Sequence, residues 1–231
     1  MELVGHRGCA DHGPENTPRA VAAAADRLPA VEIDLRRCAS GELVAAHDER
    51  VDGFTDGSGR VADLDLAALR ELRVDGSDER VATFGEILDA VPAETTLHVE
   101  LKEPGLLGDV RAELSEHDDP PALRITSFSA PALAEIARSD WAPEVGWLFG
   151  DYPDANLDLA AVLGCANVHP HARQCLDTDV VERAHDDGFG VYAWGLLDAA
   201  GEPSNRAATV RALADRGVDG VTTDTWDIPE P

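Results

Sequence analysis

LVGHRGCADHGPENTPRAVAAAADRLPAVEIDLR, residues 3–36, contains the structural unit that the rest of the chain repeats. Its first residues, 3–8, read as a short strand. Asn16 or Thr17 then precedes Pro18, which is typical of a helix N-terminus, and the alanine-rich run predicts a helix over 17–27. A second apolar run predicts a strand over 31–36. The order strand, helix, strand indicates parallel strands covered by helices.

The same order recurs to the end of the chain. Further strands are expected at 43–47, 96–101, 123–127, 145–149, 166–169, 191–194 and 220–223. Further helices are expected at 65–72, 83–91, 105–116, 131–139, 156–163, 178–187 and 205–216, with Asp177 or Thr178 as the cap that opens 178–187. About eight strand–helix units in this length favour an α/β fold, a (β/α)8 TIM-type barrel, over an open doubly wound sheet.

One segment interrupts this order. EIDLRRCASGELVAAHD, residues 32–48, contains two strands separated by the Ser40-Gly41 turn and no helix. Strands joined so tightly must be antiparallel, which predicts a β-hairpin after the second barrel strand, with Asp34 opposite His47 to within about two residues. Residues 49–94 are long for a connection and read as a small excursion over the barrel mouth. We expect a single domain over 1–231, with 49–94 as an insertion in it.

The charge balance excludes several kinds of partner. The chain has 45 Asp and Glu against 19 Lys and Arg, a formal net charge of −26. Nucleic acid is therefore not an expected partner, nor is an anionic membrane. A hydrophobic share of 44% argues for a folded core in spite of this acidity. The basic residues are 18 Arg and one lysine, Lys102, a bias that resembles proteins of extreme halophiles.

Segments that would indicate export or membrane insertion are not seen. No cationic leader precedes an apolar run, and the stretch 20–25 is too short to span a bilayer, so we expect a cytoplasmic protein without integral membrane association. Four cysteines without CxxC spacing indicate reduced thiols. Neither GxGxxG nor GxxxxGK[ST] occurs, which disfavours nucleotide binding. The sequence leaves the oligomeric state open.

Several expected strands end in polar residues. Glu32 and Asp34 are spaced i, i+2, so they lie on one face of their strand, and Glu100 and Lys102 repeat that spacing. In a (β/α)8 barrel the strand C-termini converge on the active site, so these groups meet there with those of His6-Arg7 and His47-Asp48. Three inward carboxylates repel one another, and a hard divalent cation, Mg²⁺ or Ca²⁺, would relieve that repulsion.

At this point the chain resembles the glycerophosphodiester phosphodiesterase family, a group of barrel-shaped phosphodiesterases similar to phospholipase C. The matching motifs run in family order over nearly the whole chain: GHRG with PENT (5–8, 14–17), EID (32–34), HD (47–48) followed by TDGSGRV, ELK (100–102), SF (127–128) and GVDGVTTD (217–224). The resemblance implies a metal-dependent hydrolase that cuts a small phosphodiester into an alcohol and glycerol phosphate.

The resemblance also implies a role for each matching residue. Glu32, Asp34 and Glu100 match the metal ligands, His6 and His47 the acid–base pair, and Arg7 and Lys102 the phosphate contacts. These roles agree with the chemistry, since cleavage requires charge neutralisation at the phosphoryl oxygens and two proton transfers. An imidazole titrates near neutral pH and suits those transfers. The sequence does not say which histidine is the acid, nor whether water or a substrate hydroxyl attacks.

For other residues a structural role competes with a functional one. A histidine near a strand end is usually structural, and this is the expectation for His12, His98, His117 and His185, whereas His169 and His171 could border the site. Glu15 and Asn16 are expected to orient the first loop. Phe128 and Trp194 could line the substrate pocket or pack in the core. The single lysine, Lys102, favours a phosphate contact, because arginine replaces lysine everywhere else.

Two departures from the family pattern concern the leaving group. After Trp194 the family usually continues Thr, an apolar residue and Asn, whereas Gly195-Leu196-Leu197-Asp198 stands here, and Thr225-Trp226 follows the final TTD where Pro is common. Alternative hypotheses are a related barrel phosphodiesterase acting on lysolipids or other polar diesters, and a non-catalytic metal- or solute-binding barrel.

Overall fold

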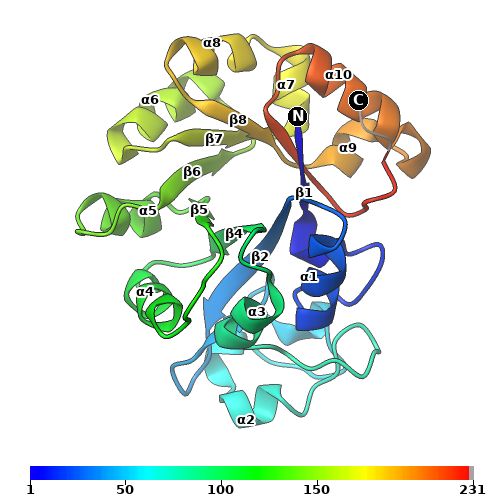
Figure 1. Cartoon of the computed structure of the whole chain (residues 1–231), viewed down its shortest axis with the longest axis vertical. Coiled ribbons are helices and arrows are strands. Elements are labelled where there is room, and N and C mark those ends of the chain that lie inside the picture. Colours follow the sequence, from blue (N-terminus) through cyan, green and yellow to red (C-terminus); the bar gives the residue numbers. More distant parts are fainter. Residues whose placement is uncertain (229–231) are drawn as a thin grey trace.

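Alternating polar and apolar residues build the strands of a closed parallel barrel. The computed structural model describes residues 1–228 (Figure 1). Eight of its strands pair in parallel in the order β1-β9-β8-β7-β6-β5-β4-β2, and β1 also pairs with β2, which closes the barrel. The strands are β1 (Glu2–Gly5), β2 (Ala30–Arg37), β3 (Leu43–Ala45), β4 (Thr96–Leu101), β5 (Leu123–Ser127), β6 (Glu144–Phe149), β7 (Asn167–Pro170), β8 (Gly190–Ala193) and β9 (Gly220–Thr223). The expected TIM-type barrel is confirmed.

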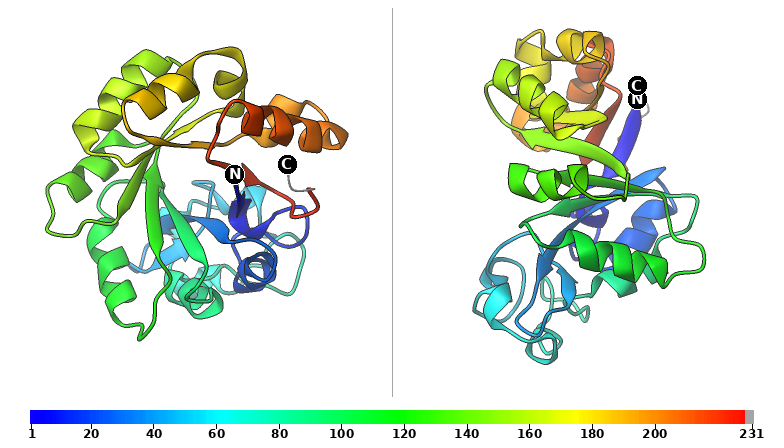
Figure 2. Two further views of the ribbon diagram at one scale, coloured as in Figure 1. Left: turned by 45° about the horizontal axis from the view of Figure 1, so that its top comes forward. Right: turned by 90° about the vertical axis from the view of Figure 1, so that its left-hand side faces the viewer.

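Helices lie around the outside of the sheet (Figure 2). They are α1 (Pro18–Ala25), α2 (Leu66–Leu69), α3 (Phe84–Ala90), α4 (Leu107–Ser115), α5 (Ala130–Ala137), α6 (Pro153–Leu163), α7 (Ala172–Asp177), α8 (Val180–Asp186), α9 (Leu196–Ala200) and α10 (Arg206–Asp215). Short 3-10 turns lie at His6–Gly8, Val51–Gly53, Val61–Asp63 and Pro203–Asn205. No helix within residues 1–228 combines the length and apolar character needed to cross a membrane.

The helices agree with the expected ranges at α1 and differ from them between residues 172 and 200. Thr17 caps α1, its side chain accepting from the Ala20 N–H. The sequence did not reveal α7, which takes up Asp177 and leaves Asp179 as the residue before α8. It also did not reveal α9, a five-residue helix that follows Gly195 in the left-handed conformation. Both unforeseen helices are too short for a clear 3.6-residue pattern.

The two faces of the strands have different chemistry. Apolar residues such as Val31, Ile33 and Leu35 point outward into the large hydrophobic core shared with the helices. Polar residues point inward, since side chains from β4 and β5 meet Tyr192 of β8 across the barrel. TIM-barrel interiors are usually filled by branched apolar residues. This barrel instead has a polar interior.

The β2–β3 hairpin and the segment after it form a satellite to the barrel. β3 is antiparallel to β2, with Leu35 opposite Ala45, and the Ala46 N–H donates to the Asp34 carbonyl at 3.0 Å. The pairing is thus one residue away from the expected Asp34–His47 match. Residues of 49–81 build a second hydrophobic cluster on Val44. The segment contacts the loop after β1, where the Glu15 N–H donates to Asp75, and none of the residues 49–94 is among those that line the cavity described below.

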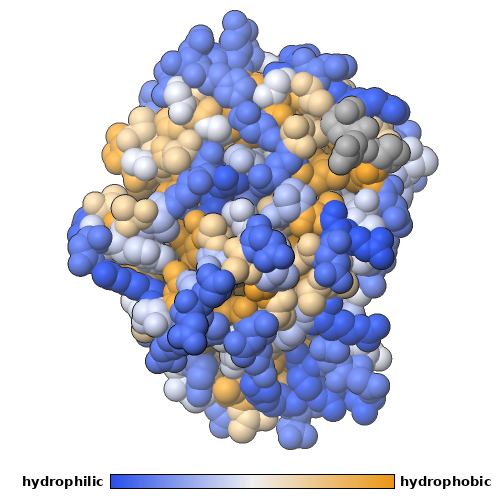
Figure 3. Space-filling view, viewed as in Figure 1, coloured by the Kyte–Doolittle hydropathy of each residue, from blue (hydrophilic) through white to orange (hydrophobic). Residues whose placement is uncertain are grey.

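The outer surface is mainly hydrophilic. In the view of Figure 3 hydrophilic residues cover much of the surface, with apolar patches between them, some of which reach the outline. Most of the acidic residues that give the chain its charge of −26 are not buried. Among residues 1–228, the acidic residues that are themselves buried are Glu32, Asp34 and Glu100.

Candidate active site

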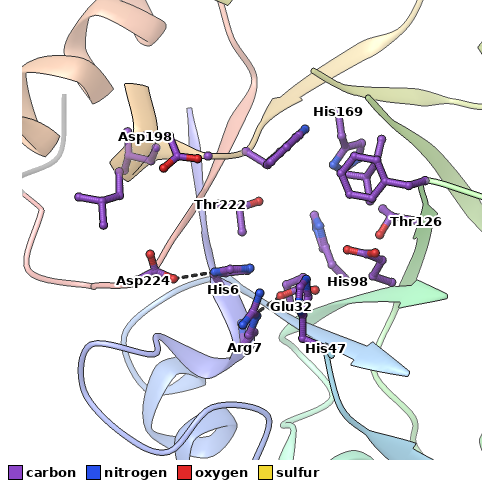
Figure 4. Close-up of a pocket in the computed structure, with 17 residues that line it drawn as sticks. His6, Arg7, Glu32, His47, His98, Thr126, His169, Asp198, Thr222 and Asp224 are labelled. Carbon is purple, nitrogen blue, oxygen red and sulfur yellow. Dashed lines mark hydrogen bonds and ion pairs between the residues drawn. The ribbon is translucent and has the colours of Figure 1, made fainter. Parts of the chain in front are cut away.

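The polar strand ends converge on one cavity of about 390 Å³ at the C-terminal end of the barrel. Figure 4 shows His6, Arg7, Glu32 and His47 grouped on one side of it. Phe128 and Trp194 line it as well. Its size is that of a small-molecule site, and its position is that of TIM-barrel active sites.

Three buried carboxylates lie at the centre of the site. Glu32 and Asp34 come from β2 and Glu100 from the neighbouring β4, where it is paired with Asp34 in the strand register. One oxygen of each lies within 4.8 Å of the others. Burial and the nearby Asp34 raise the pKa of Glu32 to about 8. Burial and Asp34 likewise raise the pKa of Glu100. The fold thus holds acidic groups together that cannot all ionise without a cation.

Asp34 keeps its charge because cations and amides surround it. Burial disfavours its ionised form, but Lys102 and Arg7 lower the pKa of Asp34 to about 2. The Asn16 side-chain amide donates to Asp34 Oδ2 at 2.9 Å and accepts from the Asp34 N–H at 3.1 Å. Asn16 adopts a left-handed backbone conformation with φ 57°, which asparagine tolerates better than most residues. The PENT loop therefore orients a carboxylate, and Asn16 is not among the residues lining the cavity.

Arg7 is fixed by the same loop. Its backbone N–H donates to Glu32 at 3.0 Å, and its guanidinium bonds Glu15 at 2.8 Å and approaches Asp34 at 3.3 Å. The residue lines the cavity while its charge is balanced from behind. Glu15 thus orients Arg7, as the sequence indicated for this loop.

His6 has a carboxylate partner that sequence reasoning missed. Its Nδ1 lies 2.6 Å from Asp224, the residue directly after β9. Burial opposes protonation of His6, but the bond to Asp224 and the charge of Glu32 raise its pKa. The available signal was the TTD motif, which places an acid at the end of the last strand beside the first. Because Nδ1 is bonded to Asp224, Nε2 remains for chemistry in the cavity.

Residues of the β2–β3 hairpin and the neighbouring Asp48 position His47. Its Nδ1 lies 2.7 Å from Asp48, and its carbonyl accepts two hydrogen bonds from the Arg36 guanidinium, at 2.8 and 3.0 Å. Burial lowers the pKa of His47, and Lys102 and Arg7 act in the same direction against the opposing charge of Asp34. The pKa values of the two cavity histidines are therefore shifted in opposite directions.

Lys102 lies among the carboxylates. Its Nζ is 2.5 Å from Glu100 and 2.9 Å from Asp34, and it does not belong to the residues that line the cavity. Burial disfavours the ammonium, but the two carboxylates raise the pKa of Lys102. In this arrangement the lysine supplies the positive charge that the acidic cluster requires.

The mouth of the cavity is apolar and aromatic. Phe128, which follows β5 and is 46% exposed, packs edge-to-face on Trp194 with ring centroids 5.2 Å apart. Leu197 and Asp198 of α9 line the mouth as well. Gly195 is required beside them, because its φ is +72° and a Cβ there would meet the His171 ring at 2.4 Å.

The remaining histidines divide between the cavity and the exterior. His98 and His169 line the cavity, and His98 also accepts a hydrogen bond from Arg124 at 2.9 Å, which agrees with the structural role expected for it. His171 caps α7 by accepting from the Arg173 N–H. His12 stacks on Trp226, 3.7 Å between ring centroids, in the segment that departs from the family pattern. His117 and His185 pair with the surface acids Asp89 and Asp219.

The acidic cluster fits a hard divalent cation. Its donors are three carboxylates, and Asp34 Oδ1 is buried with no hydrogen bond from residues 1–228, although Lys102 lies near it as an ion-pair partner. Carboxylate oxygens are the donors that Mg²⁺ and Ca²⁺ prefer. The residues therefore could hold a metal ion of this class.

Known proteins share both the sequence and the fold. The model of the glycerophosphoryl diester phosphodiesterase family matches residues 6–228. A glycerophosphodiester phosphodiesterase of Caldanaerobacter subterraneus is 24% identical over 238 residues, which cover 96% of this chain and 93% of the relative.

Solved structures agree. A phosphodiesterase of Oleispira antarctica, in complex with the product sn-glycerol-3-phosphate, superposes with a TM-score of 0.85 at 25% identity, covering 97% of this chain and 93% of that one. A glycerophosphodiester phosphodiesterase of Thermotoga maritima has the same fold, with a TM-score of 0.78 at 21% identity over 98% and 96% of the two chains.

Proposed function

This chain belongs to the glycerophosphoryl diester phosphodiesterase family, and we propose that it hydrolyses glycerophosphodiesters to an alcohol and glycerol phosphate with a divalent metal ion and two histidines. It is a phosphoric diester hydrolase. The observation that carries the finer proposal is the convergence of three buried carboxylates with His6 and His47 in one cavity.

Glu32, Asp34 and Glu100 would hold the metal ion, Mg²⁺ or Ca²⁺. When bound, such an ion neutralises the carboxylates and withdraws charge from the phosphoryl oxygens. Arg7 lines the same cavity, and its guanidinium supplies a fixed positive charge for a phosphoryl oxygen. Electrostatic stabilisation of this kind is often the largest contribution to catalysis, and losing one donor costs about 2.7–4 kcal/mol.

The two histidines suit opposite proton transfers. The raised pKa of His6 favours its protonated form, which donates to the leaving alkoxide, while the lowered pKa of His47 favours the neutral form, which accepts a proton from the attacking oxygen. Asp224 stabilises the His6 imidazolium and fixes its ring, and Asp48 orients His47. Lys102 lies against Asp34 and Glu100 and not on the cavity wall, and we propose that it contributes to phosphate binding through its positive charge.

The first experiment measures the reaction. Release of glycerol phosphate from glycerophosphocholine, glycerophosphoethanolamine and glycerophosphoglycerol is followed in molar KCl with chelator, Mg²⁺ or Ca²⁺. We expect release that the chelator abolishes and a cation restores. No release from any of the diesters by folded protein supplied with either cation would refute the proposal.

The second experiment tests the histidines. His6→Ala and His47→Ala should each lower kcat by about 10²- to 10⁴-fold, the usual worth of general acid–base catalysis. His185→Ala, a surface histidine outside the cavity, is the matched control and should keep the wild-type rate. A wild-type rate in either cavity variant contradicts its role.

A further inference from the structure

The chain makes a tight turn directly after β9. β1 and β9 pair as far as Gly5 and Thr223, so His6 and Asp224 both lie one residue beyond the paired strands. The Thr223 hydroxyl accepts from the Thr225 N–H at 3.2 Å and donates to the Thr225 carbonyl at 3.0 Å, so the two threonines enclose Asp224. In Figure 4 a dashed line joins Asp224 to His6. The geometry of this pair therefore depends on what holds the turn in place.

Asp11, in the loop that follows β1, makes the first contact with this turn. Its N–H donates to the Asp224 carbonyl at 3.0 Å. Its carboxylate pairs with the guanidinium of Arg206, a buried residue at the start of α10. The loop comes directly after the 3-10 turn His6–Gly8. One short stretch of chain thus carries His6 and bonds the backbone of its carboxylate partner.

The second contact is a stack of two rings. His12 lies parallel to Trp226, with 3.7 Å between the ring centroids and 9° between the planes, and its Nε2 lies 2.8 Å from the Thr225 hydroxyl. Trp226 also packs against the large core, and the Arg27 guanidinium lies 5.8 Å from its ring centre. Figure 1 draws the two segments side by side, in blue and red. Trp226 therefore joins the loop after β1 to the residues that follow α1.

The stack lies outside the substrate cavity. Neither ring is among the residues of 1–228 that line it. Trp226 belongs to the segment that departs from the family pattern, and a proline in that segment would offer His12 no aromatic face. Stacked aromatic rings stabilise their contact beyond the area that they bury. The stack thus restricts the turn after β9 relative to the loop after β1.

We propose that the His12–Trp226 stack positions the His6–Asp224 pair, because it fixes the turn after β9 against the loop after β1 and so holds Asp224 on Nδ1 of His6. This inference rests on the proposed function, in which His6 protonates the leaving alkoxide. A displacement of about 1 Å in a catalytic group can lower a rate by about 100-fold. His12 and Trp226 are positioning residues that act only through His6.

Two substrates with different leaving groups test this role. Glycerophosphocholine releases an alkoxide that needs a proton, whereas glycerol 3-(4-nitrophenyl) phosphate releases a weakly basic phenolate that leaves without one. Trp226→Ala should lower kcat for glycerophosphocholine by on the order of tenfold and leave kcat for the nitrophenyl ester nearly unchanged. The ratio of the two rates in one preparation does not depend on the fraction of folded enzyme, so a purely structural loss leaves it unchanged.

Asp224→Asn calibrates the measurement, since it removes the carboxylate itself. It should change the ratio of the two rates in the same direction as Trp226→Ala and by more. In the double variant, Trp226→Ala should add little to the effect of Asp224→Asn, because two changes that act through one group are not additive.

Three further variants separate the stack from general packing. Trp226→Phe keeps a ring for His12 and should retain most of the wild-type ratio. His12→Ala breaks the stack from the other side and should reproduce the effect of Trp226→Ala, also where the latter folds poorly. Trp141, a partly buried tryptophan on the same core but outside the cavity, is the matched control, and Trp141→Ala should keep the wild-type ratio.

Two results would overturn the inference while the proposed function stands. One is an unchanged ratio in Trp226→Ala and His12→Ala when Asp224→Asn alters it. The other is an equal loss from Trp226→Ala in the wild type and in Asp224→Asn, since the stack would then act through another group. An unchanged ratio in Asp224→Asn would overturn the acid role of His6 and this inference with it. Failure of the folded, metal-supplied wild type to hydrolyse any diester would overturn the proposed function as a whole.

Discussion

Lys102 balances the charge of the buried carboxylates at the scale of single residues. Its Nζ lies within 2.9 Å of both Asp34 and Glu100, and its side chain is 8% exposed. A metal ion bound by the same carboxylates would take over this neutralising role. Lys102 is the single lysine of an arginine-rich chain. Its compact charge on a flexible side chain can lie beside a metal ion bound by the same carboxylates.

Lys102→Met should therefore make the protein more dependent on metal for its stability. Without the ammonium, three carboxylates face one another in a buried site, so the melting temperature in chelator should fall, and Mg²⁺ or Ca²⁺ should restore more of it than in the wild type. Thermal unfolding in chelator and in each cation measures the difference. An equal loss with and without cation would show that the lysine does not balance the acidic cluster.

The His6–Asp224 pair predicts the alkaline limb of the pH profile. The bond to Asp224 raises the pKa of His6, so an acid role is retained below that raised pKa and lost as pH rises through it. His47, with its lowered pKa, loses its base role as pH falls through that value. kcat/KM should be bell-shaped between these limits.

Asp224→Asn should move the alkaline limb to lower pH, because the amide no longer stabilises the His6 imidazolium. The acidic limb, set by His47, should stay in place and serves as the internal control. The profile is measured with glycerophosphocholine at saturating metal. An alkaline limb that does not move contradicts the assignment of His6 as the acid.

At the scale of elements, the β2–β3 hairpin positions a functional residue. Arg36 donates two hydrogen bonds to the His47 carbonyl. The neighbouring Arg37 instead bonds the carbonyls of Gly41 and Gly105, away from His47. The two arginines, adjacent on one strand, offer a matched pair for mutation.

Arg36→Met should lower kcat by about tenfold through misplacement of His47, as expected for the loss of hydrogen bonds from a charged donor. KM and the metal titration should change little, because Glu32 and Asp34 lie elsewhere on β2. Arg37→Met should keep the wild-type kcat. Equal kcat values for both variants would show that the Arg36 hydrogen bonds do not position His47 for catalysis.

At the scale of the whole molecule, the packing of residues 49–81 against the barrel bears on whether the chain is one domain. Residues 49–81 have their own hydrophobic cluster, which includes Phe54, but this cluster also contains Cys38 and Val44 of the hairpin. Backbone pairing continues between them, since the Ala45 N–H donates to the Ala82 carbonyl. That residues 1–231 form a single domain stays a prediction.

Phe54→Ala tests it. If the chain is one domain, the cavity in the satellite cluster should lower the unfolding free energy of the entire molecule by about 3–5 kcal/mol. All four tryptophans lie outside 49–94, so their fluorescence reports on the barrel and far-ultraviolet circular dichroism on the whole. The two urea transitions should coincide and shift together. Early loss of circular dichroism with unchanged fluorescence would indicate a separate domain.

Surface charge predicts a strong dependence on salt. A net charge of −26 on 231 residues destabilises the compact state through self-repulsion. Raising KCl from about 0.1 M to 1 M shortens the screening length from about 10 Å to 3 Å, so the melting temperature should rise markedly over that range. Sucrose at matched osmolality, which does not screen charge, is the control. A melting temperature independent of KCl would contradict the halophilic interpretation of the composition.

The sequence by itself determined the barrel and most of its site. Strand–helix alternation predicted nearly every strand, because parallel strands buried under helices need apolar residues at fixed spacing. The i, i+2 spacing of Glu32 and Asp34 placed both on one face of β2, since side chains alternate along a strand. These are local rules that hold before the chain folds.

Only the tertiary structure decided which partners those residues meet. Asp224 and His6 are 218 positions apart, and they pair because β9 and β1 are neighbours in the closed barrel. Lys102, expected to contact the phosphate, forms ion pairs with Asp34 and Glu100, and its role toward phosphate stays a prediction. His169 lines the cavity because Gly146 leaves space for its ring. Hydrogen bonds and charge balance depend on distances across the barrel, which local sequence patterns do not encode.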